Sequence, residues 1–172
     1  MRRIVVGFFL CMVVVSLACI GNGCKSNSGP ETDPNGILLQ YQGCKEWSVG
    51  SDAINITARN EDCLEYLYDG RKLILKHVNA GFNCCPGTIT AEIAVTDRII
   101  SIIEREQEAG CLCLCLFDLD MEIDNLEPGE YTIRVVEPYV EDGDESLEFV
   151  VQFSAGTSGC YCVSRNYYPW ID

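Results

Sequence analysis

Apolar and polar residues alternate most regularly between residues 111 and 124. The odd positions are three cysteines followed by Phe, Leu, Met and Ile, whereas the even positions from 118 onward are Asp or Glu. A period of two over a stretch of this length is typical of a β-strand with one face in the core. The pattern therefore predicts a strand over Cys111–Asp124 with its odd positions facing inward.

Shorter stretches with the same alternation predict further strands on both sides of this one. Asp69-Gly70 is a strong signal for a two-residue hairpin turn between two of them. No window of about a dozen residues carries the apolar stripe of a helix. The additional predicted strands are Asp52–Arg59, Leu64–Tyr68, Leu73–Val78, Thr88–Val95, Arg98–Glu104, Glu130–Glu137 and Leu147–Phe153. About seven to nine short strands at this spacing predict an all-β fold, an antiparallel β-sandwich.

The segment Asn125–Ile133 reads N-L-E-P-G-E-Y-T-I. It resembles a turn found in immunoglobulin-like domains and in carbohydrate-active accessory domains. In that turn Pro and Gly set the backbone conformation, and Tyr opens the buried face of the next strand. The resemblance implies that the all-β fold is an antiparallel immunoglobulin-like β-sandwich, and it implies no particular activity.

The first residues have the layout of a secretory signal. Arg2 and Arg3 precede an apolar run over residues 4–17, which is followed by Ala18 and Cys19. This run is shorter than the roughly 20 apolar residues that a transmembrane helix needs. A basic start, a short apolar run and a small residue at the end predict export from the cytoplasm.

A cysteine at the cleavage point resembles the signal of bacterial lipoproteins, in which the new N-terminal cysteine carries acyl chains such as palmitate. We therefore predict a lipoprotein signal peptide over residues 1–18 and lipidation of Cys19, with Cys24 as the alternative lipidated residue. Two other interpretations remain open, namely cleavage after Ala18 without a lipid and an uncleaved anchor.

The residues after the cleavage point are mostly Gly, Ser, Asn, Pro and charged residues, which cannot bury a core. They predict a flexible tether over residues 19–36. Residues 37–172 then form a single domain, because a chain of this length is ample for one hydrophobic core.

The chain is strongly acidic, with 26 Asp and Glu against 12 Lys and Arg and a net charge of −14. Loss of Arg2 and Arg3 with the signal leaves ten basic residues and a net charge of −16 (10 − 26). Such a charge argues against nucleic acid as a partner and against direct docking on anionic lipid. The expected partners are the membrane, through the lipid anchor, and an unidentified protein or glycan.

Twelve cysteines are the second strong signal. Loss of Cys11 with the signal and lipidation of Cys19 leave ten, an even number that suits a disulfide framework in an oxidising compartment. Lipidation of Cys24 would instead leave one thiol without a partner. The candidate disulfide cysteines of the domain are Cys44, Cys63, Cys84, Cys85, Cys111, Cys113, Cys115, Cys160 and Cys162.

Cys111, Cys113 and Cys115 alternate along the longest predicted strand. Alternate residues on a strand lie about 6.6 Å apart, which is too far for the sulfurs to share one zinc ion or to bond to each other. Each therefore needs a partner elsewhere, and Cys84 and Cys85 are candidates. The alternative hypothesis is a copper- or zinc-handling or redox lipoprotein that uses these five cysteines, although no C-x-x-C motif is present.

Other candidate chemistry is sparse. His77 is the only histidine, and it shares a strand face with Leu73 and Leu75, so we expect a partly buried structural residue. The acidic segment Glu141–Glu145 lacks the spacing of a calcium-binding EF-hand and is predicted to be a solvated loop. With one histidine and no G-x-S-x-G motif, we predict no enzymatic activity, no cofactor and no bound metal.

Three segments, Asn79–Gly87, Cys111–Cys115 and the ending that contains Tyr161-Cys162 and Tyr168-Pro169-Trp170, look similar to a group of small cysteine-rich bacterial lipoproteins of unknown function. This resemblance covers most of residues 44–172 and implies membrane anchoring without an activity. The expected protein is a membrane-tethered lipoprotein of the cell envelope, facing the periplasm or the cell surface, with a non-enzymatic binding or structural domain.

Overall fold

The computed structural model describes residues 33–45 and 57–171, which form nine β-strands and no helix. The strands are β1 (Asn35–Gly43), β2 (Glu61–Tyr68), β3 (Leu73–Asn83), β4 (Ile89–Thr96), β5 (Ile99–Glu106), β6 (Leu114–Asp124), β7 (Gly129–Val136), β8 (Glu148–Phe153) and β9 (Thr157–Ser164). The all-β prediction is confirmed. In the described ranges no helix is available to cross a membrane. The predicted signal peptide, Cys19, Cys24 and most of the tether lie outside these ranges.

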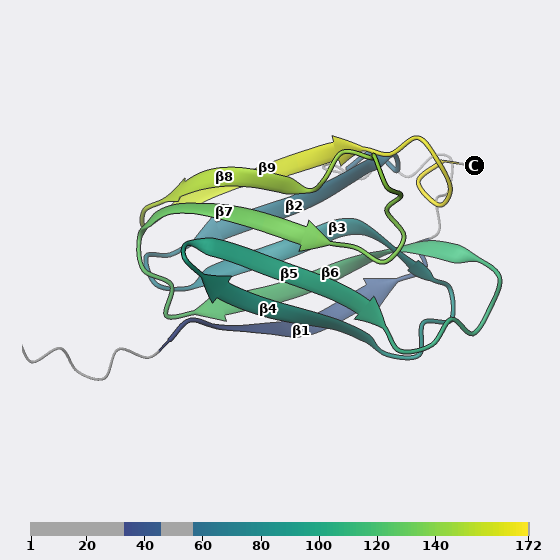
Figure 1. Ribbon diagram of the computed structural model, residues 1–172, viewed down its shortest axis with the longest axis horizontal. Helices are drawn as coiled ribbons and strands as arrows, with labels where there is room; N and C mark the ends of the chain where they lie inside the picture. The colour runs from purple at the N-terminus through teal and green to yellow at the C-terminus, as the bar shows by residue number, and fades with distance from the viewer. Residues whose placement is uncertain (1–32, 46–56, 172) are drawn as a thin grey trace, which may run out of the picture. The chain divides into compact units, whose positions relative to one another are not determined.

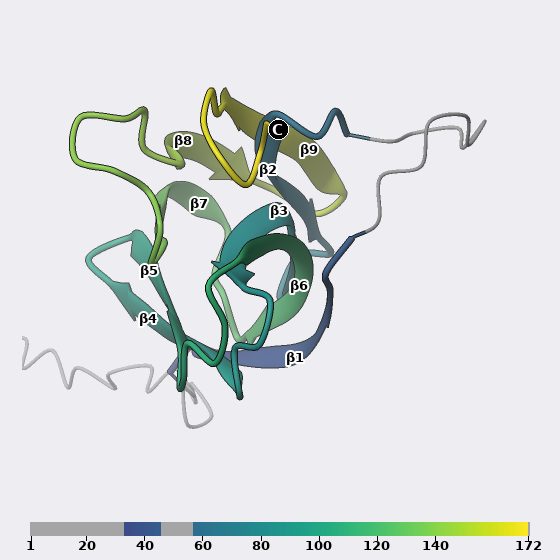
Figure 2. The same cartoon turned by 90° about the vertical axis from the view of Figure 1, so that its right-hand side faces the viewer.

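The strands form two sheets that face each other as layers (Figures 1 and 2). Sheet A has five strands in the order β1-β6-β3-β2-β9, and sheet B has four strands in the order β4-β5-β7-β8. The edge strands meet on both sides of the sandwich, where β1 lies near β4 and β8 lies near β9. The core between the layers is made of the inward-facing apolar residues of both sheets.

One strand pair departs from the predicted antiparallel arrangement. Strands β5 and β7 run parallel, with Ile100 opposite Ile133 and Ile102 opposite Val135. After β5 the chain crosses to sheet A to form β6 and then returns to sheet B as β7. Each crossing reverses the chain direction, so β7 lies beside β5 in the same direction. Sheet B is therefore mixed, and the prediction of a wholly antiparallel sandwich is wrong at this pair.

The face assignment of the longest predicted strand is confirmed for its second half. Phe117, Leu119, Met121 and Ile123 on β6 are all at most 5% exposed and belong to the core. The strand begins at Leu114, however, and not at Cys111 as predicted. Disulfides to the loop that follows β3 hold the first cysteines outside the regular ladder.

Two predicted turns are present with additional structure. The turn between β2 and β3 contains Asp69-Gly70, but Tyr68 pairs with Leu73, so the loop has four residues instead of two. The Asp69 side chain accepts hydrogen bonds from the backbone N–H groups of Arg71 and Lys72 at 2.9 and 2.7 Å. These bonds stabilise the longer loop.

In the turn before β7, the hydroxyl of Tyr131 donates a hydrogen bond to the carbonyl oxygen of Glu127 at 3.0 Å. Leu126 in the same turn is fully buried. The turn is thus attached to the core through an apolar side chain and tied to the start of β7 through a side-chain hydrogen bond.

Two strands of the structure were not predicted, and one predicted strand lies mostly outside the described residues. Neither β1 nor β9 was predicted, because most β1 side chains are exposed and β9 contains Gly159 and Cys160 among polar residues. Of the predicted strand Asp52–Arg59, residues 52–56 lie outside the described ranges, and residues 57–59 are not in a strand. Edge strands such as β1 and β9 bury fewer side chains and leave a weaker pattern.

Candidate functional site

Five charged side chains are buried together between the two sheets. They are Asp62 on β2, His77 on β3, Glu104 on β5, Glu137 just after β7 and Arg165 just after β9. Their exposed fractions are 0% for Asp62 and His77, 2% for Glu104 and 1% for Arg165, and the Glu137 side chain is 3% exposed. We call these five residues the buried charge cluster.

Each member continues the inward-facing phase of its own strand. On each strand the residue two positions away in the same phase is apolar and buried; these neighbours are Leu64, Leu75, Ile102, Val135 and Val163. The expectation that His77 would share a face with Leu73 and Leu75 is confirmed, but the expectation of partial burial is wrong. The acidic residues and Arg165 were not predicted as part of a site.

Hydrogen bonds connect the whole cluster. Both ring nitrogens of His77 are engaged, with Nε2 at 2.7 Å from Asp62 Oδ1 and Nδ1 at 2.7 Å from Glu104 Oε1. Arg165 donates to Asp62 Oδ2 from Nε at 2.9 Å and from Nη2 at 2.6 Å. The same Nη2 donates to Glu137 Oε2 at 2.9 Å. Asp62 therefore accepts hydrogen bonds from two cations, one on each carboxylate oxygen.

The buried environment shifts the pKa values of three members of this cluster in different directions. Burial by itself would lower the pKa of His77, but the charges of Glu104 and Asp62 raise that pKa well above its ordinary value. Burial raises the pKa of Glu137 well above its ordinary value, and the neighbouring Asp62 charge adds to this effect. Burial also opposes ionisation of Asp62, yet His77 and Arg165 together bring its pKa below the usual range. Three acidic residues thus face two basic ones, His77 and Arg165, and the raised pKa of Glu137 reduces this imbalance.

The cluster also brings together three atoms that metals use as ligands. Asp62, His77 and Glu137 each offer one such atom, and these atoms lie within 4.8 Å of one another. However, His77 Nε2 already contacts Asp62, and the guanidinium of Arg165 occupies the other oxygen of each carboxylate. A cation here would lie next to that guanidinium, so the hydrogen-bond network describes the site better.

Disulfides engage eight of the nine cysteines in the described ranges. The pairs are Cys44–Cys115, Cys63–Cys162, Cys84–Cys113 and Cys85–Cys111. No bond forms within the C-x-C-x-C run, and each of its cysteines has a partner outside it, as predicted. The reason given for this prediction is wrong, however, because Cys111 and Cys113 precede β6 and their sulfurs lie 3.6 Å apart. The prediction of a disulfide-stapled fold is confirmed.

Several of these sulfurs also lie close enough to form metal-binding groups. Cys44, Cys84 and Cys115 form one such set within 4.8 Å, and Cys84, Cys111 and Cys113 form another. Every sulfur in both sets belongs to a disulfide, whereas a metal ligand is a thiolate. These sets can therefore bind a metal only after reduction.

Cys160 is the one described cysteine outside a disulfide, and it is exposed on β9. Its sulfur lies 3.4 Å from that of Cys162. Burial raises the pKa of the Cys160 thiol, and the charges of Glu65 and Glu61 raise it further. Cys160 therefore carries little thiolate at neutral pH and is a poor nucleophile.

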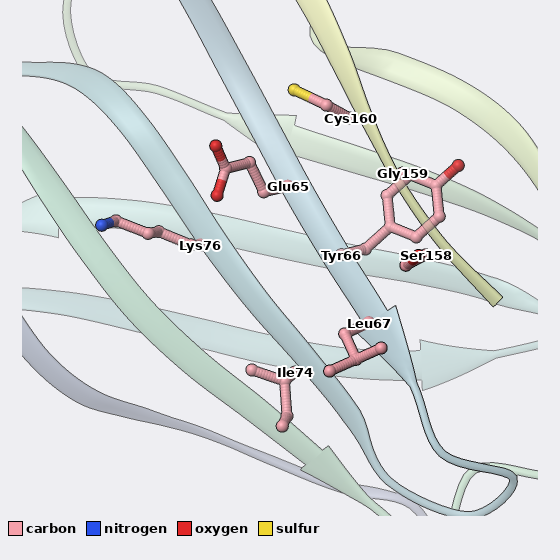
Figure 3. A pocket seen from close by; sticks show the side chains of 8 residues that line it. All are labelled: Glu65, Tyr66, Leu67, Ile74, Lys76, Ser158, Gly159 and Cys160. Atoms are coloured by element: carbon pink, nitrogen blue, oxygen red, sulfur yellow. The ribbon is translucent and has the colours of Figure 1, made fainter. Parts of the chain in front are cut away.

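A shallow depression of about 360 Å³ lies beside Cys160 on the outer face of sheet A. Figure 3 shows its side chains on strands β3, β2 and β9, with Leu67 close to Ile74 and with Glu65 and Lys76 extending from neighbouring strands. Leu67 and Ile74 are 47% and 44% exposed. The depression therefore combines two partly exposed apolar side chains with the thiol of Cys160.

The acidic segment Glu141–Glu145 forms a loop between β7 and β8. The side chain of Asp144 accepts a hydrogen bond from the backbone N–H of Glu141 at 3.2 Å, and the Glu145 carbonyl accepts one from Arg165 at 2.6 Å. Among the described residues, no metal-binding group includes a carboxylate of this loop. The interpretation as a solvated loop is retained.

The chain matches no known protein family, no curated protein and no solved structure. The similarity to small cysteine-rich lipoproteins accordingly stays a prediction, and the functional conclusion rests on the geometry described above.

Proposed function

We propose that this chain is a membrane-tethered lipoprotein of the cell envelope, acylated at Cys19, whose β-sandwich is a non-enzymatic binding or structural domain. The domain faces the periplasm or the cell surface, and we expect its ligand to be a protein or a glycan. The finer fold assignment belongs to the same proposal, namely an immunoglobulin-like sandwich. The Tyr131–Glu127 hydrogen bond supports it, because a tyrosine that ties a turn to its strand recurs in such folds.

The four disulfides are the observation that carries the proposal. Disulfides form and persist in oxidising compartments and are rare in the cytosol. All four join cysteines that are far apart in the sequence, with separations of 71, 99, 29 and 26 residues. Four covalent links within one domain support a protein that is built to persist outside the cell's reducing interior.

The state of His77 supports a non-catalytic domain. A general base must come within hydrogen-bond reach of its substrate. His77 is completely buried, and carboxylates occupy both of its ring nitrogens. The usual catalytic role of a histidine is thus replaced by a structural one at the centre of the sandwich.

Metabolic labelling with a palmitate analogue tests the lipid anchor. We expect the full-length protein to incorporate the label and to enter the detergent phase, and the Cys19→Ala variant to lose both properties. The Cys24→Ala variant is the matched control and should keep the label. Loss of the label from Cys24→Ala alone would move the anchor to Cys24, and absence of label from all three proteins would contradict the proposal.

A second candidate function is metal handling or redox exchange by Cys84, Cys85, Cys111, Cys113 and Cys115. The observation that favours it is the proximity of these sulfurs, since those of Cys111 and Cys113 lie only 3.6 Å apart. A thiol count on protein isolated with its thiols blocked discriminates between the two functions. Reactive thiols or stoichiometric copper or zinc at these cysteines would favour the second candidate.

A further inference from the structure

Strand β9 is an unprotected edge of sheet A. It pairs with β2 on one side, and in the described part of the chain no strand pairs with its other side (Figures 1 and 2). Strand β8 lies near it but belongs to sheet B. Proteins usually protect such an edge with a charged side chain, a proline, a β-bulge or a very short strand. The eight residues of β9 include no charge and no proline, and their register with β2 contains no bulge.

Each of the other three edge strands has one of these protections. Strand β1 contains a bulge between Leu38 and Gln40 and lies near β4. Strand β4 carries the exposed charge of Glu92, and β8 is only six residues long and begins with Glu148. Among the strands that the structure describes, β9 is therefore the edge that is best suited to accept a further strand.

The pairing with β2 shows which backbone groups of β9 face this edge. In an antiparallel pair the Cα atoms of hydrogen-bonded residues lie about 5.5 Å apart, and those of the other pairs about 4.5 Å. The Cα atoms of Cys63 and Cys162 are 4.0 Å apart, so this pair is not hydrogen-bonded. The bond from the N–H of Arg165 to the carbonyl of Asn60 at 2.9 Å agrees with this phase. The β9 residues whose backbone N–H and C=O point away from β2 are therefore Ser158, Cys160, Cys162 and Ser164.

These edge-facing backbone groups are available to a partner. Within the described ranges, no turn, loop or side chain forms a hydrogen bond with the backbone of any of the four residues. All four residues are also exposed. Donors and acceptors thus alternate along the free side of β9 in the arrangement that an added antiparallel strand requires.

The charge pattern identifies the partner. Residues 149–164 contain no Asp, Glu, Lys or Arg, although the net charge of the chain is −14. The acidic surfaces of two copies repel each other, but their uncharged β9 edges can meet. We propose that β9 pairs with β9 of a second copy, antiparallel about a two-fold axis, so that the two copies of sheet A form one continuous sheet. This dimer is independent of the lipid anchor and goes beyond the proposed function.

A two-fold axis at Tyr161 uses all the edge-facing groups of β9. It places Ser158 opposite Ser164 of the second copy, and Cys160 opposite Cys162 of the second copy. Each of these pairs joins residues whose N–H and C=O face the edge, so the pairs are of the hydrogen-bonded type and supply about eight backbone hydrogen bonds. A strand that pairs with its own copy makes a symmetric, closed contact, so the assembly stops at a dimer.

Cysteine cross-linking of the full-length protein tests the pairing and its register. The double variant Ser158→Cys/Ser164→Cys is made in a Cys160→Ser background and oxidised with copper phenanthroline. We expect a covalent dimer on a non-reducing gel, because Cα atoms about 5.5 Å apart suit a disulfide. The two new cysteines cannot bond within one copy, since six residues of extended strand separate them by about 20 Å.

The single variants Ser158→Cys and Ser164→Cys in the same background are the matched controls. The two-fold axis places neither residue opposite itself, so both proteins should remain monomers on the same gel. Equal cross-linking of the double and single variants would overturn the inference, and so would a double variant that forms no covalent dimer.

Sedimentation velocity of the full-length protein in detergent, without oxidant, measures the association itself. We expect a dimer for the wild type and a monomer for Ser158→Pro, because proline removes an edge-facing N–H and leaves the bonds to β2 in place. Ser158→Ala keeps this N–H and should remain a dimer. Urea midpoints of the three proteins should be similar, which separates loss of the interface from loss of the fold.

Two outcomes of the sedimentation experiment would overturn the inference. One is a monomeric wild type, which would leave the edge of β9 to a strand of another protein. The other is a dimer that Ser158→Pro leaves unchanged, which would place the contact between copies elsewhere. The cross-linking result does not depend on this proline variant and tests the β9 pairing even if Ser158→Pro fails to fold.

Discussion

His77 on β3 and Glu104 on β5 join the two sheets through a buried hydrogen bond of 2.7 Å between Nδ1 and Oε1. Both side chains lie where apolar residues would otherwise complete the core. A buried charge pair contributes little to stability relative to apolar residues of similar size, but removal of one partner leaves an uncompensated charge. The buried charge cluster therefore makes the sandwich sensitive to the loss of any single member.

The first prediction concerns Glu104→Ala. We expect the free energy of unfolding to fall by about 3–5 kcal/mol, because the charged His77 ring loses one of its two carboxylates. Urea unfolding with the disulfides intact, followed by tryptophan fluorescence, measures this loss. The control is Glu92→Ala, which removes an exposed carboxylate paired with Arg105 and should cost no more than about 1 kcal/mol. Similar losses of unfolding free energy in both variants would contradict the larger contribution assigned to the buried charge cluster.

The second prediction concerns pH. The folded pKa of His77 lies well above its ordinary value of about 6.5, so the folded state holds a proton that the unfolded state releases. The stability from this proton is complete below pH ~6.5 and decreases as the pH rises toward the folded pKa. The pKa of Glu137 is also raised in the folded state, so its contribution to stability likewise decreases as the pH rises. This decrease begins near the ordinary pKa of a glutamate, which is lower than that of a histidine. We expect urea midpoints to fall between pH ~6.5 and alkaline pH.

A His77→Gln variant is the control for this pH dependence. It should be less stable than the wild type at neutral pH, and its stability should change less with pH above ~6.5. At acid pH Asp62 has the opposite effect on stability. Its pKa is lowered in the folded state, so protonation of this carboxylate below its ordinary pKa weakens the folded state. An unchanged slope in His77→Gln would show that His77 is not the titrating group.

The third prediction uses two neighbouring valines on β8. Val151 is 8% exposed and faces the core, whereas Val150 is 61% exposed. The same substitution to Asp should destabilise the protein by about 3 kcal/mol or more at Val151, because an unpaired carboxylate enters the core. At Val150 it should change stability by less than about 0.5 kcal/mol. Thermal unfolding followed by circular dichroism compares them, and a reversed order would refute the strand register.

The fourth prediction concerns the disulfide between Cys84 and Cys113. The double variant Cys84→Ser/Cys113→Ser should lose about 3–4 kcal/mol, because the bond closes a loop with a sequence separation of 29 residues. Denaturant unfolding without reductant measures the loss. Cys160→Ser removes a cysteine outside the four disulfides and should cost far less. A double variant as stable as the wild type would show that this bond does not form in the native protein.

Alternation was enough to predict most strands and their buried faces. The inward positions of β6 followed directly from Phe117, Leu119 and Met121, because the buried face is apolar and the other face is acidic. Three features were beyond this pattern: the edge strands β1 and β9, the parallel pair β5–β7 and the late start of β6. Edge strands bury little, and strand order depends on which sheet each strand joins. A disulfide also overrides local preference at Cys111 and Cys113.

The buried charge cluster was the larger omission, although the sequence carries a signal for it. On three strands and directly after two others, a charged residue or histidine stands two positions from a core residue in the inward phase, as Asp62 does before Leu64 and Glu104 does after Ile102. Taken singly, such a residue looks like a strand end that reaches solvent. Only the pairing of strands shows that the five positions meet.

Intact mass of the mature protein, isolated from membranes and measured before and after reduction, tests the central claim most directly. The account predicts a chain that begins at an acylated Cys19 and gains eight hydrogens on reduction, two for each of the four disulfides. A chain that keeps its leader, carries no acyl group and gains no mass on reduction would contradict it.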